Sequence, residues 1–277
     1  MAFAKYFLII TIISQIGNLS LAANDPSNPA EIQQIGIGGN ISQPTNQNYQ
    51  TNVATLLSDF ISESSSQRRL SYFNTSAGTV PDTAYGFYLC EAFIGGEECN
   101  SCLRNVAQYL ANNQTTIYSD SIVFNSDLRC IVRYSNTSSS FVYRENTTIT
   151  GRGYGDNLVN FPEYNTTLIN TLRETASMPG SGNGDQIIQG FYVMLNGGDV
   201  VGTRERISVF GQCVPGITSM NCSDCVSNLF STFPPAFKGG QILGLNCFVK
   251  YNDEPFSSGG YRSFMPSYLH MFMVLLL

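Results

Sequence analysis

The sequence contains few charged residues and no strongly basic segment. Charged side chains make up 12% of its 277 residues, whereas soluble domains usually contain about 25%. The 14 Lys and Arg are outnumbered by 20 Asp and Glu, and no basic cluster is larger than the pair Arg68–Arg69. A nucleic-acid-binding protein needs a basic face that displaces counterions from phosphates. Nucleic acid is therefore not expected as a partner, and an anionic membrane surface is equally unfavourable.

The sequence also lacks side chains suited to catalysis. Its only histidine, His270, lies near the C-terminus. The adjacent acidic residues Glu97 and Glu98 stand in a loop-like context that is typical of solvated surface. The Gly-rich run 151–155 lacks the preceding strand and following helix that a phosphate-binding loop requires. We therefore predict a non-enzymatic protein with no cofactor and no metal.

The N-terminus has the pattern of a secretory signal. Lys5 precedes the apolar stretch Tyr6–Ile13, and Ala22 and Ala23 offer a cleavage site. A membrane anchor would need about 20 apolar residues, and polar residues interrupt this run sooner. Residues 1–23 are therefore predicted to be a signal peptide, which makes the mature chain extracellular.

Eight cysteines repeat one spacing pattern. In each copy, eight residues separate the first two cysteines, two residues separate the second from the third, and a fourth follows further on. The copies are Cys90, Cys99, Cys102 and Cys130, and Cys213, Cys222, Cys225 and Cys247. The simplest interpretation is a tandem repeat of one cysteine-stapled module. In an oxidising compartment, structural disulfides are favoured over zinc ligation or a redox pair.

Spacing alone does not decide the disulfide pairing, because four cysteines allow three connectivities. A bond between Cys99 and Cys102 would close a very short, strained loop at the start of a helix. The favoured pairs are Cys90–Cys99, Cys102–Cys130, Cys213–Cys222 and Cys225–Cys247. Each bond is expected to contribute about 2–4 kcal/mol by restricting the unfolded chain.

Apolar periodicity predicts the same order of elements in both modules. Each module opens with a helix, continues with a strand that carries its first cysteine, starts a second helix at the close cysteine pair, and places its fourth cysteine at the start of an alternating strand. These elements are expected at 53–61, 85–90, 103–110 and 130–134, and again at 164–176, 207–213, 226–233 and 247–251. Further strands are expected at Phe141–Arg144 and Gly190–Leu195. Helices on one face of a small antiparallel sheet make each module α+β.

The elements divide the chain into six parts. They are a signal peptide (1–23), a flexible leader without apolar periodicity (24–43), the first module (44–146), a Gly-rich linker (147–160), the second module (161–255) and a C-terminal tail (256–277). The apolar end of the tail, Tyr268–Leu277, is too short to span a membrane as a helix. Free secretion is therefore expected, with a removed lipid-anchor signal or a truncated anchor as alternatives.

Asn-x-Ser/Thr sequons are frequent, and in an exported chain they indicate glycosylated surface positions. The sites expected to carry glycans are Asn40, Asn74, Asn113, Asn136, Asn146 and Asn165. A seventh sequon, at Asn221, directly precedes Cys222 inside a small disulfide loop and is expected to be empty.

The cysteine spacing, together with the segments 73–78, 99–103 and 130–136, resembles the plant ginkbilobin-homologous domain, also called the salt-stress-response/antifungal domain. The resemblance covers residues 44 to 255. It implies an extracellular plant protein in which each module has an antiparallel sheet of about five strands and two helices. Tandem members include secreted cysteine-rich repeat proteins, plasmodesmata-located membrane proteins and the ectodomains of cysteine-rich receptor-like kinases.

The resemblance also raises the question of sugar binding, because single-module seed members bind mannose. They use an Asn near the module's start, an Arg before the last cysteine and a Glu after it. The nearest equivalents here are Phe124 and Ser135 in the first module, and Gln241 and Asn252 in the second. Neither module keeps the charged pair, so mannose binding is not expected and the ligand is left unassigned.

The function expected from the sequence is that of a secreted, non-enzymatic binding or signalling module of the plant apoplast, in stress or defence. Its partner would be a cell-wall glycan or an extracellular protein, and membrane contact is expected only if the tail is an anchor signal. The alternative is a cell-surface-anchored interaction protein at the plasma membrane or plasmodesmata, or a fragment of a receptor-like kinase ectodomain.

Overall fold

The computed structural model describes residues 31–37, 47–66, 71–113, 118–141, 148–180, 185–188, 191–232, 235–253 and 256. Residues Glu31–Leu277 form one compact unit. The predicted signal peptide, the sequons at Asn40 and Asn146 and the apolar end of the tail lie outside the described residues. Within the described part, no helix is both long and apolar enough to cross a membrane.

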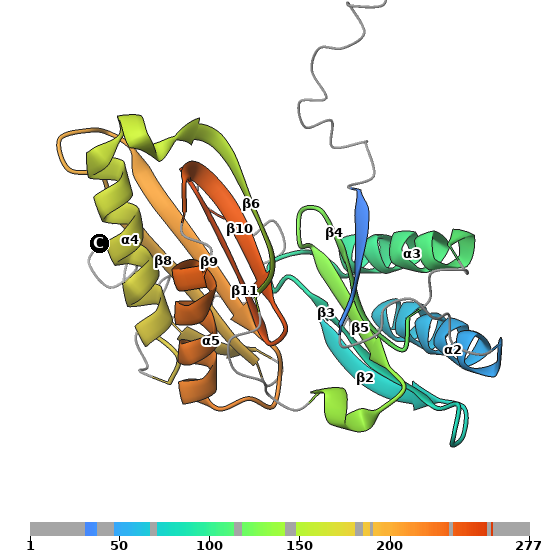
Figure 1. The fold of residues 1–277 in the computed structure, drawn as a ribbon. Helices are drawn as coiled ribbons and strands as arrows, with labels where there is room; N and C mark the ends of the chain where they lie inside the picture. Colours follow the sequence, from blue (N-terminus) through green and yellow to red (C-terminus); the bar gives the residue numbers. More distant parts are fainter. Residues whose placement is uncertain are drawn as a thin grey trace, which may run out of the picture. The chain divides into compact units, whose positions relative to one another are not determined.

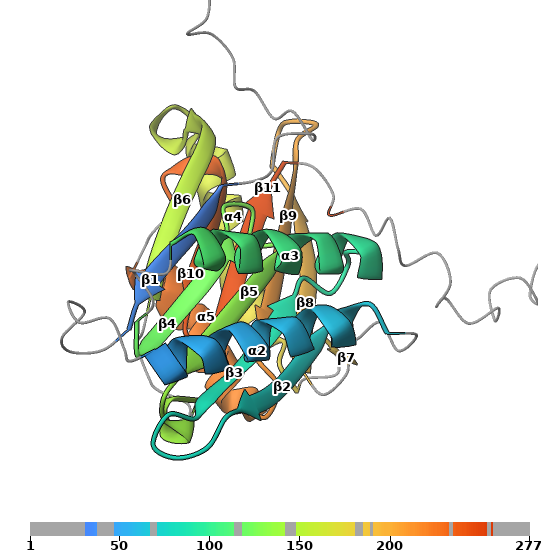
Figure 2. The same cartoon turned by 90° about the vertical axis from the view of Figure 1, so that its right-hand side faces the viewer.

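The first module is a five-stranded antiparallel sheet with two helices on one face (Figures 1 and 2). The strands lie in the order β1-β4-β5-β3-β2. They are β1 (Ile32–Gly36), β2 (Tyr72–Ala77), β3 (Ala84–Cys90), β4 (Asp120–Asn125) and β5 (Cys130–Ser135), and the helices are α2 (Gln47–Ser64) and α3 (Gly96–Asn112).

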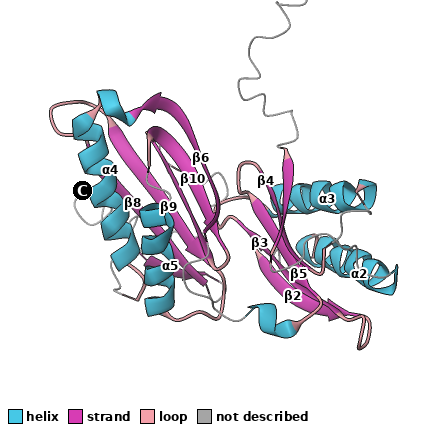
Figure 3. Cartoon of the chain, viewed as in Figure 1, coloured by secondary structure: helices cyan, strands magenta, loops and turns pink. Residues whose placement is uncertain are grey.

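The second module repeats this plan, with helices on one face of a sheet (Figure 3), and has one more strand at its edge. Its strands lie in the order β6-β10-β11-β9-β8-β7. They are β6 (Thr148–Asn157), β7 (Asp185–Ile188), β8 (Phe191–Asp199), β9 (Arg206–Cys213), β10 (Phe237–Gly244) and β11 (Cys247–Asn252), and the helices are α4 (Pro162–Ser177) and α5 (Ser219–Thr232). The predicted α+β class and tandem architecture are confirmed.

The helices form where apolar residues recur on one face. Val53, Leu56 and Phe60 of α2 are at most 1% exposed, and Leu168 and Leu172 of α4 are fully buried. These residues recur every three or four positions, so a single stripe of each helix packs against its sheet. Burial of that stripe, more than local propensity, stabilises helices of this length.

The central strands are buried on both faces. In β5, Cys130, Val132 and Tyr134 pack with α2 and α3, while Ile131, on the opposite face, belongs to a different apolar cluster. Successive side chains of a strand point to opposite faces of its sheet. Each sheet therefore has one face covered by helices and one face without helices. The helix-free face is also apolar and must be buried against another part of the protein.

The helix-free faces of the two modules share one apolar core. It is formed by Phe87, Leu89, Ile122, Phe124, Leu128 and Ile131 of the first module and by Val193, Phe210, Leu243 and Phe248 of the second. The rings of Phe210 and Phe248 lie 5.6 Å apart, edge to face. Because this core contains residues of both modules, the modules bury apolar surface against each other.

The predicted flexible leader, 24–43, is wrong for residues 32–36. These residues form β1, which pairs antiparallel with β4 from Ile32 opposite Asn125 to Gly36 opposite Ser121. Ile32 packs against the helix-side core and Ile35 against the core between the modules. The free edge of β4 thus supplies hydrogen-bond partners and apolar cover that the local sequence does not reveal.

The predicted linker, 147–160, is also wrong, because residues 148–157 form β6 at the edge of the second sheet and pair with β10. Gly153 accommodates the ring of Phe237, since a Cβ atom at this position would meet Phe237 Cδ2 at 2.2 Å. Gly153 therefore leaves room for an aromatic ring of the neighbouring strand, and the segment is a strand rather than a flexible linker.

The strand predicted at Phe141–Arg144 is not found at Phe141, which ends a 3-10 helix, Ser138–Phe141; residues 142–144 lie outside the described part. Phe141 packs on the helix-free face of the first sheet, with its ring centroid 5.7 Å from that of Phe87 and 5.1 Å from the Arg133 guanidinium carbon. These contacts hold the chain in a turn instead of letting it continue as a strand.

Candidate functional site

All eight cysteines are paired in disulfides, Cys90–Cys99, Cys102–Cys130, Cys213–Cys222 and Cys225–Cys247. These are the pairs favoured from the sequence. In each module, one bond ties the end of a strand to the first turns of the second helix, and the other ties the same helix to the central strand. The cysteines therefore hold helix and sheet together. Among the described residues, no group of three or more His, Cys, Asp and Glu is placed to hold a metal ion.

A buried glutamine joins the two modules through backbone hydrogen bonds. Gln212 of β9 is fully buried. Its Nε2 donates to the carbonyl of Cys90 at 2.9 Å, and its Oε1 accepts from the backbone N–H of Ala92, also at 2.9 Å. Both polar ends of a buried amide are thus satisfied by the other module, as burial of a polar group requires.

A buried ion pair lies beside this glutamine. Lys250 of β11 donates from Nζ to Glu91 Oε2 at 2.7 Å, and the two side chains are only 10% and 11% exposed. Burial lowers the pKa of Lys250 below its ordinary value, and the negative charge of Glu91 opposes that shift. Because charges removed from water are costly without a partner, this contact couples the position of Glu91 to that of the second sheet.

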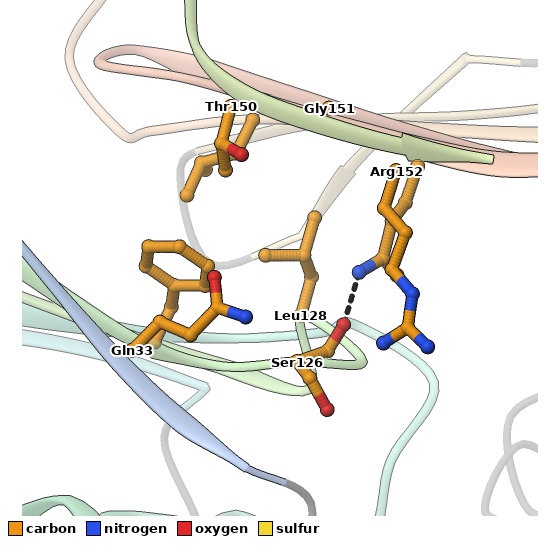
Figure 4. A pocket seen from close by; sticks show the side chains of 9 residues that line it. Gln33, Ser126, Leu128, Thr150, Gly151 and Arg152 are labelled. Carbon is orange, nitrogen blue, oxygen red and sulfur yellow. Dashed lines mark hydrogen bonds between the residues drawn. The ribbon is translucent and has the colours of Figure 1, made fainter.

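A cavity of about 210 Å³ lies further along the same interface (Figure 4). It is lined by Gln33 of β1, Phe124 of β4, Ser126 and Leu128 of the β4–β5 turn, Thr150, Gly151 and Arg152 of β6, and Gln241 and Leu243 of β10. In the figure, Gln33 approaches from one side and Arg152 forms the opposite wall. The cavity therefore contains hydrogen-bond donors and acceptors from both modules, and apolar side chains of both modules close its inner end.

The register of the second sheet explains which residues face the cavity. Gln241 lies directly opposite Arg152 on β6 and opposite Lys250 on β11, so these three polar side chains form one row across the helix-free face. Gln241 Nε2 donates to the carbonyl of Ser126 in the other module. The row runs from the exposed Arg152 to the buried Lys250.

Two of the four residues compared with the mannose-binding positions, Phe124 and Gln241, line this cavity. Ser135 is fully buried at the end of β5, and Asn252 is partly buried at the end of β11. The structure thus brings one residue from each module together at the interface and leaves the other two outside the cavity.

Phe124 and Gln241 were matched because each lies six residues before the fourth cysteine of its module, but the strand register shows that they are not structurally equivalent. Gln241 pairs with Lys250, whereas the counterpart of Lys250, Arg133, pairs with Ile122. The β4–β5 turn contains four residues between its strands and the β10–β11 turn contains two, which shifts the count by two. Ile122, and not Phe124, is therefore the structural counterpart of Gln241.

The cavity residues Gln33, Thr150 and Arg152 were not predicted from the sequence, because they lie in the segments expected to be a leader and a linker. The alternation of Thr150, Arg152 and Tyr154 with glycines is the signal that could have identified β6 as a strand. For β1, the sequence offers only spaced isoleucines, which are too few for a strand prediction.

The described sequons differ in exposure. Asn74 and Asn136 are exposed, and Asn113 and Asn165 are partly exposed. Asn221 is partly buried within α5, next to Cys222. Glycosylation at the first four positions, and its absence at Asn221, remain predictions.

The family model for salt stress response/antifungal proteins matches residues 38–137 and 152–254, one match for each module. The chain belongs to this family. The resemblance seen in the cysteine motifs is therefore confirmed. The two matches also agree with the duplication of sheet, helices and disulfides.

Curated relatives of this chain include cysteine-rich repeat secretory proteins and receptor-like protein kinases of Arabidopsis thaliana. The chain is 28% identical over 206 residues to cysteine-rich repeat secretory protein 7, covering 73% of this chain and 69% of that protein. It is 25% identical over 244 residues to cysteine-rich repeat secretory protein 8, covering 83% and 81%. In cysteine-rich receptor-like protein kinase 34 the match covers only 32% of the kinase, at 24% identity.

Solved structures show the same fold. The tandem DUF26 ectodomain of the Arabidopsis thaliana cysteine-rich receptor-like protein PDLP8 superposes with a TM-score of 0.62 at 14% identity, covering 82% of this chain and 99% of that chain. The corresponding ectodomain of PDLP5 gives 0.59 at 18% identity, covering 80% and 98%. The chain thus has the tandem fold of these ectodomains. Its membership of a family of plant secretory proteins makes it extracellular.

Proposed function

We propose that this chain is a secreted, non-enzymatic binding or signalling protein of the plant apoplast that acts in stress or defence by recognising a glycan or a protein partner. The observation that carries the proposal is the cavity between the modules, whose polar lining comes from both of them. A site of this kind exists only when the two modules are packed together. The tandem arrangement thus provides a binding cavity that a single module lacks.

The comparisons support this proposal at the level of the family. Several relatives are named as secretory proteins, and others carry a matching segment as about a third of a receptor kinase. The buried pairing of all eight cysteines also leaves no thiol available as a nucleophile.

An array of plant cell-wall glycans, probed with the secreted protein, tests the proposal. We expect selective binding to at least one glycan class, or capture of a defined extracellular protein in a parallel screen of purified apoplastic proteins. Mannan is not expected to bind, because neither module has the charged pair of the seed lectins. Absence of binding in both screens, with protein whose four disulfides are verified by mass spectrometry, would refute the proposal.

An anchored cell-surface form is the second candidate, favoured by the fold that the chain shares with ectodomains of receptor-like proteins. Expression in plant cells with a tag placed after Ala23 separates the two forms. Protein in the culture fluid supports free secretion, whereas protein released from membranes only by phospholipase supports a lipid anchor.

A further inference from the structure

We propose that the cavity between the modules binds a small saccharide that carries a carboxylate, such as a uronic acid residue, and that the Arg152 guanidinium receives the carboxylate. This assignment rests on the proposed function, because it specifies the ligand class and the place of binding for an extracellular recognition protein.

The size of the cavity limits the ligand. Its volume of about 210 Å³ is far above the roughly 10–15 Å³ that a single water needs and below the roughly 300–1,000 Å³ of pockets for drug-sized molecules. A ligand the size of one sugar residue therefore suits the enclosed part, and further residues of an oligosaccharide would extend into solvent past the exposed Arg152.

The charge of the lining selects for an anion. Arg152 forms no ion pair with a carboxylate of any described residue, and none of the nine lining residues is acidic. A guanidinium presents a planar fork of donors that matches a carboxylate in a bidentate pair. The same lining offers no counter-charge to an ammonium group, which disfavours amino acids and basic peptides.

The remaining polar groups suit hydroxyls. The amide of Gln33 and the hydroxyl of Thr150 form no side-chain hydrogen bond with another described residue. An amide and a hydroxyl can each donate and accept, as the hydroxyls of a sugar ring require. Phe124, Leu128 and Leu243 also line the cavity but are at most 2% exposed, so they close its inner end and a sugar ring would contact mainly the polar side chains.

An acidic residue beside this lining gives the proposal a sensitive test. Asp127 is exposed and lies between Ser126 and Leu128, both of which line the cavity. Burial is the main cause that raises the pKa of Tyr154, on the same face of β6 as Arg152; the negative charge of Asp127 raises it further, and the charge of Arg152 lowers it. The two charges thus act on the same region with opposite signs, and Asp127 opposes the binding of an anion there.

Calorimetric titration with trigalacturonic acid, and with the neutral galactose trimer as the matched ligand, tests the assignment. We expect the acidic trimer to bind and its affinity to fall as salt is raised, because Arg152 is exposed to solvent. The neutral trimer should bind at least about tenfold more weakly, the effect of losing one charge-assisted hydrogen-bonded pair.

Three variants locate the binding site. Arg152→Gln should weaken binding of the acidic trimer about tenfold and leave the neutral trimer unchanged. Arg173→Gln, on the exposed face of α4, is the matched control and should have no effect. Asp127→Asn should strengthen acidic binding about twofold, and a gain of affinity cannot arise from misfolding.

The outcomes separate this proposal from the proposed function. If neither Arg152→Gln nor Asp127→Asn changes the affinity for the acidic trimer, the trimer binds elsewhere on the protein. This outcome overturns only the proposed site. Failure of the acidic trimer to bind, while another glycan or an apoplastic protein binds, overturns the ligand class. Failure in every screen overturns the proposed function as well.

Discussion

The two modules differ most clearly at one equivalent position, three residues after the fourth cysteine. There the first module has Arg133 and the second has Lys250, both buried on the helix-free face. Arg133 pairs within its own module, 3.8 Å from Asp120, and lies over the Phe141 ring. Lys250 instead pairs with Glu91 of the other module. At equivalent positions, Arg133 thus stabilises the first module internally, whereas Lys250 joins the second module to the first.

The largest effect is expected from breaking the pair between modules. Lys250→Ala leaves Glu91 buried without a counter-charge, so the free energy of unfolding in urea should fall by about 3–5 kcal/mol. Arg133→Ala should cost less, because its pair with Asp120 is longer than the Lys250 pair. Only the Lys250 variant should also loosen the packing of the modules, which small-angle scattering would detect as an increased radius of gyration.

The double variant Lys250→Met with Glu91→Gln is the control for this prediction. It removes both charges while keeping side chains of similar size, so much of the stability should return. A cost below about 1 kcal/mol for Lys250→Ala alone would show that water reaches the pair and that it does not hold the modules together.

The disulfides provide the next comparison, since they close loops of similar length in both modules. Cys102–Cys130 spans 28 residues and Cys225–Cys247 spans 22. Replacing either pair by alanines should reduce the free energy of unfolding by about 2–4 kcal/mol, and the two losses should differ by less than about 0.5 kcal/mol. A much larger difference would mean that the native modules relax differently around the missing bond, so that loop closure is not the main term.

A smaller effect is expected at Gln212, whose counterpart in the first module is Leu89. Each lies opposite the residue that follows the fourth cysteine. Gln212→Leu leaves the buried backbone groups of Cys90 and Ala92 without their partner and should cost about 1–3 kcal/mol in urea unfolding. Leu89→Met, an apolar exchange of similar volume at the equivalent position, should cost less than about 1.5 kcal/mol. If Gln212→Leu and Leu89→Met lowered the free energy of unfolding equally, water would be supplying the hydrogen bonds that the Gln212 amide makes to Cys90 and Ala92.

The smallest effect is expected from buried tyrosines at high pH. Tyr134 and Tyr251 occupy equivalent positions, and burial raises the pKa of Tyr134 to about 12 and that of Tyr251 above its ordinary value. Above pH 10 the unfolded chain loses these protons while the folded protein keeps them, so stability falls as pH rises, by at most about 1.4 kcal/mol per pH unit for each tyrosine. Tyr134→Phe and Tyr251→Phe should each flatten this decline, as measured by urea unfolding between pH 9 and 11.5.

Lys250 acts in the opposite direction in the same experiment. Its pKa is lowered in the folded protein, so the unfolded chain holds the extra proton and this contribution to stability rises as pH approaches 10.5. Comparing each Tyr→Phe variant with the parent protein at the same pH cancels the lysine contribution. Other buried tyrosines, such as Tyr49 and Tyr88, also have a raised pKa and share in the decline. An unchanged slope in both variants would contradict a contribution from Tyr134 and Tyr251.

The disulfide pattern shows where reasoning from the sequence reaches its limit. Strain excludes a Cys99–Cys102 bond, but two connectivities then remain, and spacing does not distinguish Cys99 from Cys102 as the partner of Cys90. The choice depends on which cysteine of α3 turns toward the end of β3 and which toward β5. That orientation is set by the packing of Leu103, Val106 and Leu110 against the sheet.

The sequence by itself determined the repeat, the two helices of each module, the strands that carry its first and fourth cysteines and the export of the chain. Each of these is encoded within a few tens of residues, by a cysteine spacing, an apolar leader or a regular recurrence of apolar positions. Only the tertiary structure decided that residues 32–36 and 148–157 are edge strands, and that Glu91 meets Lys250, 159 positions away. It also created the cavity, because a strand edge or a buried charge finds its partner only after the chain has packed.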